Sequence, residues 1–316
     1  MIKKIFSSSF VLILLIFSCS SDSDDNSSEV WEQKSEMLTN WADNFIIPYY
    51  TTLTNKLENL EASANTFTIS RNQQNLENLR NSFINAYLSW QYVEMFDIGL
   101  AEETYYKSKM NIYPTTASKI ELNIQNGNTD FNNSNNFSAQ GFPALDYLLY
   151  GIETSDELII SKYNSDSRYL SHIYEIIDQM LQNTYIIVDD WESYRNTFIS
   201  SVENTATSSV NKMTNDFIYY YEKGFRANKF GIPAGVFSGG ALPEKVEAFY
   251  NQNISKALAL EGFQAIKNFY NGNGGVSLRQ YISEVATEEY SELSTDILDQ
   301  FNIAENLIND LNENFY

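Results

Sequence analysis

Apolar residues recur at intervals of three and four along almost the whole chain, and this periodicity restricts the fold more than any other feature. Such spacing forms one apolar stripe on an α-helix, whereas a half-buried β-strand shows alternation with period two. Sustained period-two alternation does not occur in the sequence. The first two stripes are Leu38, Trp41, Phe45, Tyr49, Leu53, Leu57 and Leu60, and then Leu76, Leu79, Phe83, Tyr87 and Trp90. The pattern therefore predicts an all-α protein in which Pro48 bends the first long helix.

The helical pattern continues to the end of the chain. Further stripes run from Leu170 to Trp191, from Tyr194 to Tyr221, from Val246 to Phe269 after the helix-start residue Pro243, and through 278–285 and 297–311. Helix bundles bury such stripes, and the length suits two bundles better than one. We expect two packed helical-bundle halves, at residues 31–165 and 166–316. The 22 Tyr and 20 Phe residues supply ample material for a core.

The first 30 residues have the composition of an export signal followed by a tether. Lys3 and Lys4 precede an apolar run at 10–17 that is too short to span about 30 Å of hydrocarbon. The run ends at Cys19, the chain's single cysteine, which occupies the position of a lipobox cysteine. The sequence thus predicts a lipoprotein signal peptide at 1–18, lipidation of Cys19, and a solvated acidic tether at 19–30. The membrane, reached through that lipid, is then one partner of the protein.

The strongly acidic composition excludes one class of partner. The formal net charge is -21 at pH 7, and phosphate-bearing partners would be repelled by it. We therefore expect no nucleic-acid binding and no direct adsorption to anionic lipid. Cations and basic partners remain compatible with this charge.

Two regions interrupt the helical pattern. Residues 111–140 are polar and rich in turn formers, which predicts a long irregular excursion. Residues 223–243 contain a glycine-rich loop at 231–240, without the Lys-Ser/Thr that a phosphate-binding loop needs. Each region contains a similar tetrapeptide, Gly141-Phe142-Pro143-Ala144 and Gly231-Ile232-Pro233-Ala234. This echo is explained either by two related halves or by shared turn chemistry.

The usual catalytic constellations are missing from the sequence. His172 is the single histidine, whereas hydrolytic zinc sites normally use two or more imidazoles. A lone histidine of this kind is typical of a helix start or a surface position. Serine chemistry lacks a histidine base, and Cys19 is expected to carry lipid. We therefore predict no catalytic residue and no metal ligand. Acidic pairs such as Glu102-Glu103 and Asp189-Asp190 are more typical of solvated helix faces than of cation sites, and the Tyr clusters are more typical of core and rim than of a ligand groove.

Several segments resemble the imelysin family of lipoproteins, also known as peptidase family M75. The main one is Gly141-Phe142-Pro143-Ala144-Leu145-Asp146-Tyr147-Leu148-Leu149-Tyr150-Gly151, and Asn111-Ile112-Tyr113-Pro114, Lys229-Phe230-Gly231-Ile232-Pro233-Ala234-Gly235 and Val246-Glu247-Ala248-Phe249-Tyr250 also correspond. The resemblance implies an all-helical fold of two bundle-like halves with the motif near their interface, in proteins linked to iron uptake and classed as metallopeptidases. The acidic residues after Cys19 also resemble surface-export signals of Bacteroidetes lipoproteins. They imply a lipid-anchored outer-membrane location, on the periplasmic or the cell-surface face.

The sequence departs from the family motif at its chemical centre. Pro143 stands at the motif's histidine position and Asp146 at its glutamate position. Proline has no side-chain donor atom, and aspartate is shorter than glutamate, so iron or zinc binding and peptidase activity are both in doubt. Asp146 either caps a helix first turn or pairs with Arg226 or Lys229 across a cleft between the halves.

The resulting candidate binding residues are Gly141, Pro143, Asp146, Tyr113, Arg226 and Lys229. We expect a noncatalytic binding or accessory lipoprotein that serves iron or other nutrient acquisition. Its expected partner is a small ligand, a peptide or an outer-membrane transport protein. The alternative is a metallopeptidase of the imelysin type with a degenerate metal motif.

Overall fold

The computed structural model describes residues 24–251 and 253–315, and over these residues the protein consists of helices and turns without a β-strand. The predicted all-α class is therefore confirmed. No helix in the described part of the chain combines the length and the apolar content needed to cross a membrane. The predicted signal peptide at 1–18 and Cys19 lie outside the described residues. Helix α1 begins at Asp24, so the later part of the predicted tether at 19–30 has a helical backbone.

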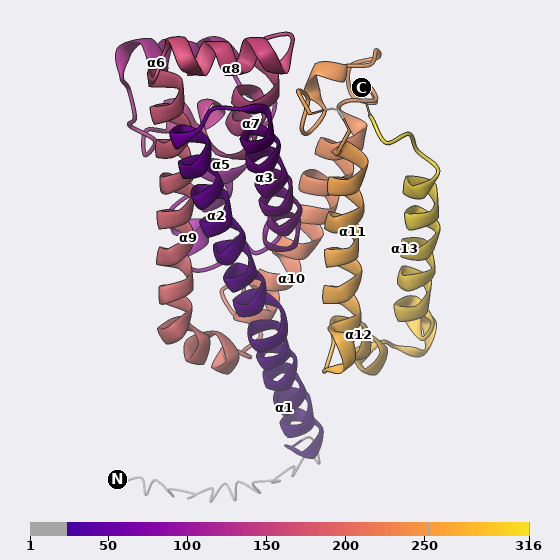
Figure 1. Ribbon diagram of the computed structural model, residues 1–316. Coiled ribbons are helices and arrows are strands. Elements are labelled where there is room, and N and C mark those ends of the chain that lie inside the picture. The colour runs from indigo at the N-terminus through magenta and orange to yellow at the C-terminus, as the bar shows by residue number, and fades with distance from the viewer. Residues whose placement is uncertain (1–23, 252, 316) are drawn as a thin grey trace, which may run out of the picture.

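The first group of long helices contains α2, α3 and α9 (Figure 1). α1 (Asp24–Trp41) passes through the π-helix η1 (Ala42–Ile46) into α2 (Ile47–Ile69), and Pro48 lies in the first turn of α2. α3 (Gln73–Val93) and α9 (Arg168–Ser200) both pack along α2. Nearly all members of the two predicted N-terminal stripes are buried in this group.

The second group contains α10 (Ser209–Tyr219), the π-helix η4 (Tyr220–Gly231), α11 (Ser255–Asn271), α12 (Leu278–Val285) and α13 (Leu293–Asn309). α11 packs against α3 of the first group, and α13 covers the outer side of α11 (Figure 1). One continuous apolar core extends through both groups. The boundary predicted at residue 165 would assign α9 to the second half. In the structure α9 packs mainly against α2 and so belongs to the first group, and the second group begins with α10.

A series of short helices connects α3 to α9. They are α4 (Leu100–Glu103), α5 (Tyr106–Met110), α6 (Ala117–Asn126), the 3-10 helix η2 (Ser134–Ala139), α7 (Gly141–Asp146), the π-helix η3 (Tyr147–Gly151) and α8 (Asp156–Ser165). The excursion predicted at 111–140 is thus partly helical. Its α6 is amphipathic and buries Ile120 and Ile124 against the core. Two helices of this series, α6 and α8, lie at the upper end of the molecule in Figure 1.

The second irregular region was placed too early in the chain. η4 continues to Gly231, and turns follow at 232–242. Pro243 begins a 3-10 turn, η5 (Pro243–Lys245), and the expected helix starts only at Ser255. Residues 246–254 remain nonhelical because their polar groups are held by other elements, as described below.

Candidate functional site

Three segments far apart in the sequence meet at α7, and we call them together the motif corner. They are residues 113–115, α7 itself at 141–146, and residues 244–251. Gly141 begins α7 with a φ of +70°, and a Cβ placed there would lie 2.2 Å from the carbonyl oxygen of Met110. Both observations require glycine, because other residues rarely adopt this φ and the contact leaves no room for a side chain. The glycine therefore lets α7 start directly against the end of α5.

Asp146 holds the opposite wall of the motif corner in place. It is the last residue of α7, 1% exposed, and its two carboxylate oxygens accept hydrogen bonds from the backbone N–H groups of Tyr250 (2.8 Å) and Asn251 (2.9 Å). Burial raises the pKa of Asp146 to about 7, although the two backbone bonds favour the charged form. The expected position in a helix first turn was wrong, since this carboxylate binds amides more than 100 residues downstream.

Neither basic residue predicted to pair with Asp146 does so. Arg226 lies at the surface and forms an ion pair with Glu222 on the same π-helix at 2.6 Å. Lys229 is buried and instead contacts Glu247 at 2.5 Å. The two basic side chains thus point to different sides of η4, and only Lys229 reaches the interior.

Lys229 is the centre of a buried polar cluster under the motif corner. Its ammonium also donates to Gln91 at 2.7 Å and lies 3.6 Å from Glu94. Burial by itself would lower the pKa of Lys229, but attraction to Glu247 and Glu94 outweighs it and the pKa is raised. The remaining contacts join Asn111 to Glu94, Glu247 and Tyr87, Gln91 to Glu247, and Tyr220 to Glu94.

The segment 246–251 is fixed from several directions. The Glu247 carboxylate contacts Lys229, and its backbone carbonyl accepts a hydrogen bond from the Ser255 hydroxyl at 2.9 Å. The next residue, Ala248, has a φ of +56°, a conformation that costs a nonglycine residue roughly 1–3 kcal/mol and is common at ligand sites. Contacts with Asp146 and Lys229 from separate helices hold this segment in that conformation.

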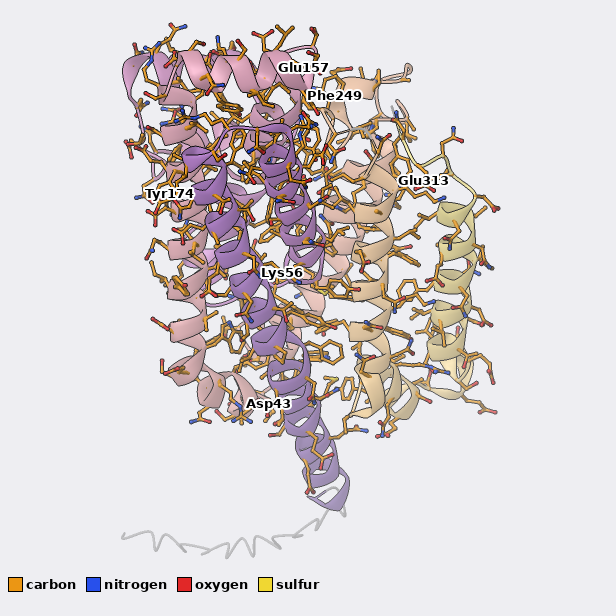
Figure 2. All side chains as sticks on the ribbon, viewed as in Figure 1. Asp43, Lys56, Glu157, Tyr174, Phe249 and Glu313 are labelled. Carbon is orange, nitrogen blue, oxygen red and sulfur yellow. The ribbon has the colours of Figure 1, made fainter. Side chains whose placement is uncertain are left out.

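A pocket of about 230 Å³ opens at the motif corner. The hydroxyl oxygen of Tyr113 is buried and has no hydrogen-bond partner, and burial raises the pKa of Tyr113 well above its usual value. Phe249, which forms part of the wall, lies near the upper end of the molecule between the two helix groups (Figure 2). The pocket is lined by Tyr113, Pro114, Thr115, Pro143, Asp146, Glu244, Val246, Ala248, Phe249 and Tyr250. Tyr113, Pro143 and Asp146 are thus brought together as predicted, whereas Gly141, Arg226 and Lys229 do not line the pocket.

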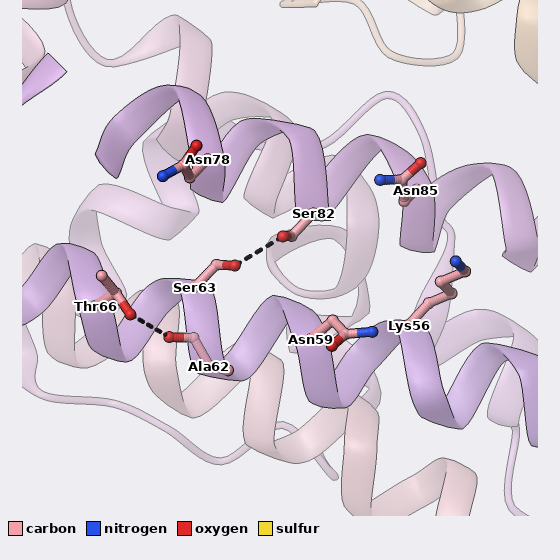
Figure 3. A pocket seen from close by; sticks show the side chains of 8 residues that line it. All are labelled: Lys56, Asn59, Ala62, Ser63, Thr66, Asn78, Ser82 and Asn85. Atoms are coloured by element: carbon pink, nitrogen blue, oxygen red, sulfur yellow. Dashed lines mark hydrogen bonds between the residues drawn. The ribbon is translucent and has the colours of Figure 1, made fainter. Parts of the chain in front are cut away.

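A second hollow lies on the outer surface between α2 and α3, with a volume of about 370 Å³ (Figure 3). Its lining includes Asn59, Asn78 and Asn85, and the hydroxyls of Ser63 and Ser82 bond across it at 2.7 Å. These side chains belong to exposed or partly exposed positions on two regular helices. Because no special backbone geometry or buried unpaired group marks this groove, the motif corner is the stronger candidate site.

The sequence profile of imelysin matches residues 46–315. The chain belongs to the imelysin family. A crystal structure from Parabacteroides distasonis ATCC 8503, named as an iron-regulated protein A precursor, is similar with a TM-score of 0.74 at 15% identity, covering 90% of this chain and 88% of that chain. An imelysin-like protein from Psychrobacter arcticum 273-4 is similar with a TM-score of 0.72 at 16% identity, covering 90% of this chain and 86% of that chain. No curated protein sequence matches the chain.

In this imelysin, the donor set at the motif does not fit a transition metal. Both oxygens of Asp146 already accept backbone hydrogen bonds, and Pro143 offers no donor atom. Among the side chains described at 32–251 and 253–315, no group of three or more His, Cys, Asp or Glu is arranged to hold a metal ion. Glu102, one of the acidic residues considered above, pairs with Lys212 at 2.6 Å.

The histidine lies in the interior, away from the pocket lining. His172 is near the start of α9 as expected, but it is 3% exposed rather than at the surface. Its ring packs beside Phe131, and its Nε2 atom has no hydrogen-bond partner. Burial lowers the pKa of His172 to about 4, so the imidazole is neutral at physiological pH.

The polar cluster contains residues that the sequence prediction missed, chiefly Glu94, Gln91 and Asn111. A signal for two of them was present in α3. Gln91 and Glu94 continue the helical face of Tyr87 and Trp90, because positions three, four and seven apart lie on one side of a helix. Polar residues that extend an apolar stripe are candidates for a buried cluster.

Proposed function

We propose that this imelysin is a noncatalytic binding protein that holds a small ligand in the pocket of the motif corner. The unpartnered, buried Tyr113 hydroxyl carries the proposal, because a buried polar group without a partner costs free energy unless a ligand or water satisfies it. The pocket is also largely preformed, since Asp146 and Lys229 fix its wall from two helices. Preformed concave sites with few convergent polar groups are typical of ligand binding.

The role of Asp146 supports binding over catalysis. A carboxylate that activates water or holds a catalytic metal needs an oxygen directed at the reacting atoms. Here both oxygens accept backbone hydrogen bonds, so the side chain holds the segment at Tyr250 and Asn251, of which Tyr250 lines the pocket. We therefore assign Asp146 a positioning role.

We place this binding protein in iron or other nutrient acquisition, as a lipoprotein anchored through Cys19 to the outer membrane. The similar structure named as an iron-regulated protein A precursor supports the nutritional context. The predicted export signal and lipidation motif support the location. An outer-membrane transport protein is the partner that such an accessory role requires.

Fluorotyrosine NMR of the purified protein tests the binding site. Amines, amino acids, short peptides and ferric complexes would be titrated separately, and the Tyr113 resonance would be assigned with Tyr113→Phe. We expect one class to shift the Tyr113 and Tyr250 signals saturably. The exposed Tyr105 and Tyr219 serve as controls whose signals stay unchanged.

A cleavage assay tests the noncatalytic character. The protein would be incubated with an unfolded protein substrate and zinc or ferrous ion, and products would be followed by mass spectrometry. We expect no cleavage above that of a heat-inactivated control. Metal-dependent cleavage that disappears in Asp146→Ala would establish the peptidase alternative instead.

A further inference from the structure

Three aromatic residues line the pocket of the motif corner, and we refer to them as the cage. The rings of Phe249 and Tyr250 lie 5.0 Å apart at an interplanar angle of 77°, and Tyr113 lines the same pocket. The ring of Tyr250 makes an edge contact with Tyr147. It also packs directly against Gly151, because a Cβ at that position would lie 2.2 Å from the ring. The faces of aromatic rings carry partial negative charge and attract cations, most strongly at sites removed from water.

The charged groups at the pocket have the same sign. Two of its ten lining residues, Asp146 and Glu244, are acidic, and neither lysine nor arginine is among them. Since burial raises the pKa of Asp146 to about 7, Asp146 is only partly ionised at neutral pH, and Glu244 contributes most of the negative charge. Glu244 is exposed, which places its carboxylate at the solvent-facing side of the pocket. Behind the wall, the single ammonium of Lys229 faces the two carboxylates of Glu94 and Glu247. An anion entering this pocket would therefore be repelled, and a cation would be attracted.

The volume of the pocket and the residues that line it restrict the size and the chemical class of the ligand. The pocket volume of about 230 Å³ is below the range of about 300–1,000 Å³ that is usual for drug-sized ligands. Proline rings, Val246 and Ala248 supply apolar contacts, and Tyr113, which also lines the pocket, has a buried hydroxyl without a hydrogen-bond partner. A bare metal ion would leave the apolar wall unused, and a peptide would exceed the volume.

From these observations we infer that the pocket recognises a small organic cation, an alkylated or primary ammonium group with a short polar tail. The ammonium group contacts the faces of Phe249, Tyr250 and Tyr113, and Glu244 attracts it from the entrance. The Tyr113 hydroxyl accepts a hydrogen bond from the ligand or donates one to its polar tail. This inference rests on the proposed binding function and adds the chemical class of the ligand.

Choline and its neutral isostere 3,3-dimethylbutan-1-ol provide a matched pair of probes, since they share shape and differ in charge. Isothermal titration calorimetry of the purified protein should show saturable choline binding, with the neutral alcohol at least about tenfold weaker. A primary-amine probe, ethanolamine, distinguishes alkylated from unsubstituted ammonium as the preferred group. Equal affinity for choline and the alcohol would overturn the inference.

Two single substitutions test the contacts. Phe249→Leu keeps an apolar side chain but removes the aromatic face, and choline should bind about twofold to thirtyfold more weakly. Tyr113→Phe keeps the ring and removes only the hydroxyl, so it should weaken choline less than Phe249→Leu if the aromatic faces dominate. Asn59→Ala in the groove between α2 and α3 is the control and should leave choline affinity unchanged.

The outcomes separate this inference from the binding function beneath it. If neither choline nor ethanolamine binds, but another class shifts the Tyr113 signal in fluorotyrosine NMR, the organic-cation inference fails and the binding function stands. If no class shifts that signal, both fail. If Phe249→Leu binds choline with wild-type affinity while the protein remains folded by circular dichroism, the assignment of the cage is wrong.

Discussion

Lys229 and Arg226 occupy the same π-helix, yet they illustrate two different uses of a basic residue. Lys229 is 2% exposed and contacts residues from α3 and from 246–251, so it connects three parts of the chain. Arg226 is more than half exposed and pairs with Glu222 one helical turn away. The first contact fixes the tertiary arrangement of the motif corner, while the second is confined to one helix.

This contrast extends to the surroundings of the two residues. The motif corner and the polar cluster under it contain buried carboxylates, a buried ammonium and a nonglycine residue with positive φ, each of which costs free energy unless its neighbours compensate. The outer surface contains the same residue types in solvated pairs of small energetic consequence. The concentration of such unfavourable groups around one pocket is consistent with the binding function proposed for it.

The largest difference should appear when each basic residue is replaced by methionine. Lys229→Met leaves Glu94 and Glu247 buried without their cation, which should lower the free energy of unfolding by about 3–5 kcal/mol. Arg226→Met removes an exposed pair and should cost less than about 1 kcal/mol. Urea unfolding followed by circular dichroism measures both. Equal costs for the two variants would show that the buried cluster does not stabilise the fold as described.

A pair of glycines gives the next comparison. Gly141 and Gly127 both have positive φ, but a Cβ at Gly141 would meet the Met110 backbone, whereas one at Gly127 would meet nothing within 4 Å. Gly127→Ala should therefore cost only the conformational strain, about 1–2 kcal/mol. Gly141→Ala should cost at least about 2 kcal/mol more, because α7 or α5 must shift. Thermal unfolding of the two variants tests this, and similar melting temperatures would contradict the close packing at Gly141.

The sequence predicted the helices well because amphipathic periodicity is a local property. The stripes of α2 and α3 are largely buried, because residues three and four apart lie on one side of an α-helix wherever that helix packs. The start of α11 was predicted too early because the apolar residues at 246–254 also fit a helix. There, Asp146 binds the amides of Tyr250 and Asn251, and that tertiary contact overrides local preference.

The site was predicted less completely, for two physical reasons. The partners of Asp146 are separated from it by 104 and 105 residues, and nothing near Asp146 in the chain indicates them. The orientation of Lys229 depends on η4 being a π-helix, in which hydrogen bonds join residues five apart, so α-helical spacing does not predict its inner face. Tyr113, Pro143 and Asp146, named from the resemblance to imelysins, line the same pocket, but the Lys229 cluster was visible only in the structure.

The buried His172 should make the stability of the protein depend on pH. The pKa of buried His172 is lowered from 6.5 to about 4, mainly by desolvation, while the nearby Glu121 opposes this shift. The unfolded chain therefore binds the proton first, so this residue should reduce stability as the pH falls from about 6.5 toward 4, by at most about 3 kcal/mol. His172→Phe should lack this contribution, and its stability relative to wild type should rise on acidification. Urea unfolding of both proteins at pH 8, 6 and 4.5 measures the difference, and a constant difference would refute the assignment.

The smallest effect is expected for a substitution at Pro143, although the family motif would suggest a large gain in metal affinity there. Pro143→His restores an imidazole at the motif position, but both oxygens of Asp146 remain bound to the amides of Tyr250 and Asn251, which orient the carboxylate toward the backbone. A single imidazole with a committed carboxylate is a poor zinc site, because structural and catalytic zinc use at least three protein ligands. Zinc affinity by competition with a chromophoric chelator should therefore stay close to that of wild type, whereas a large gain would mean that Asp146 can release its amides to a metal. Pro143 would then be the residue that keeps a metal ion from this pocket, and Asp146 in place of glutamate would be the remaining departure from the family motif.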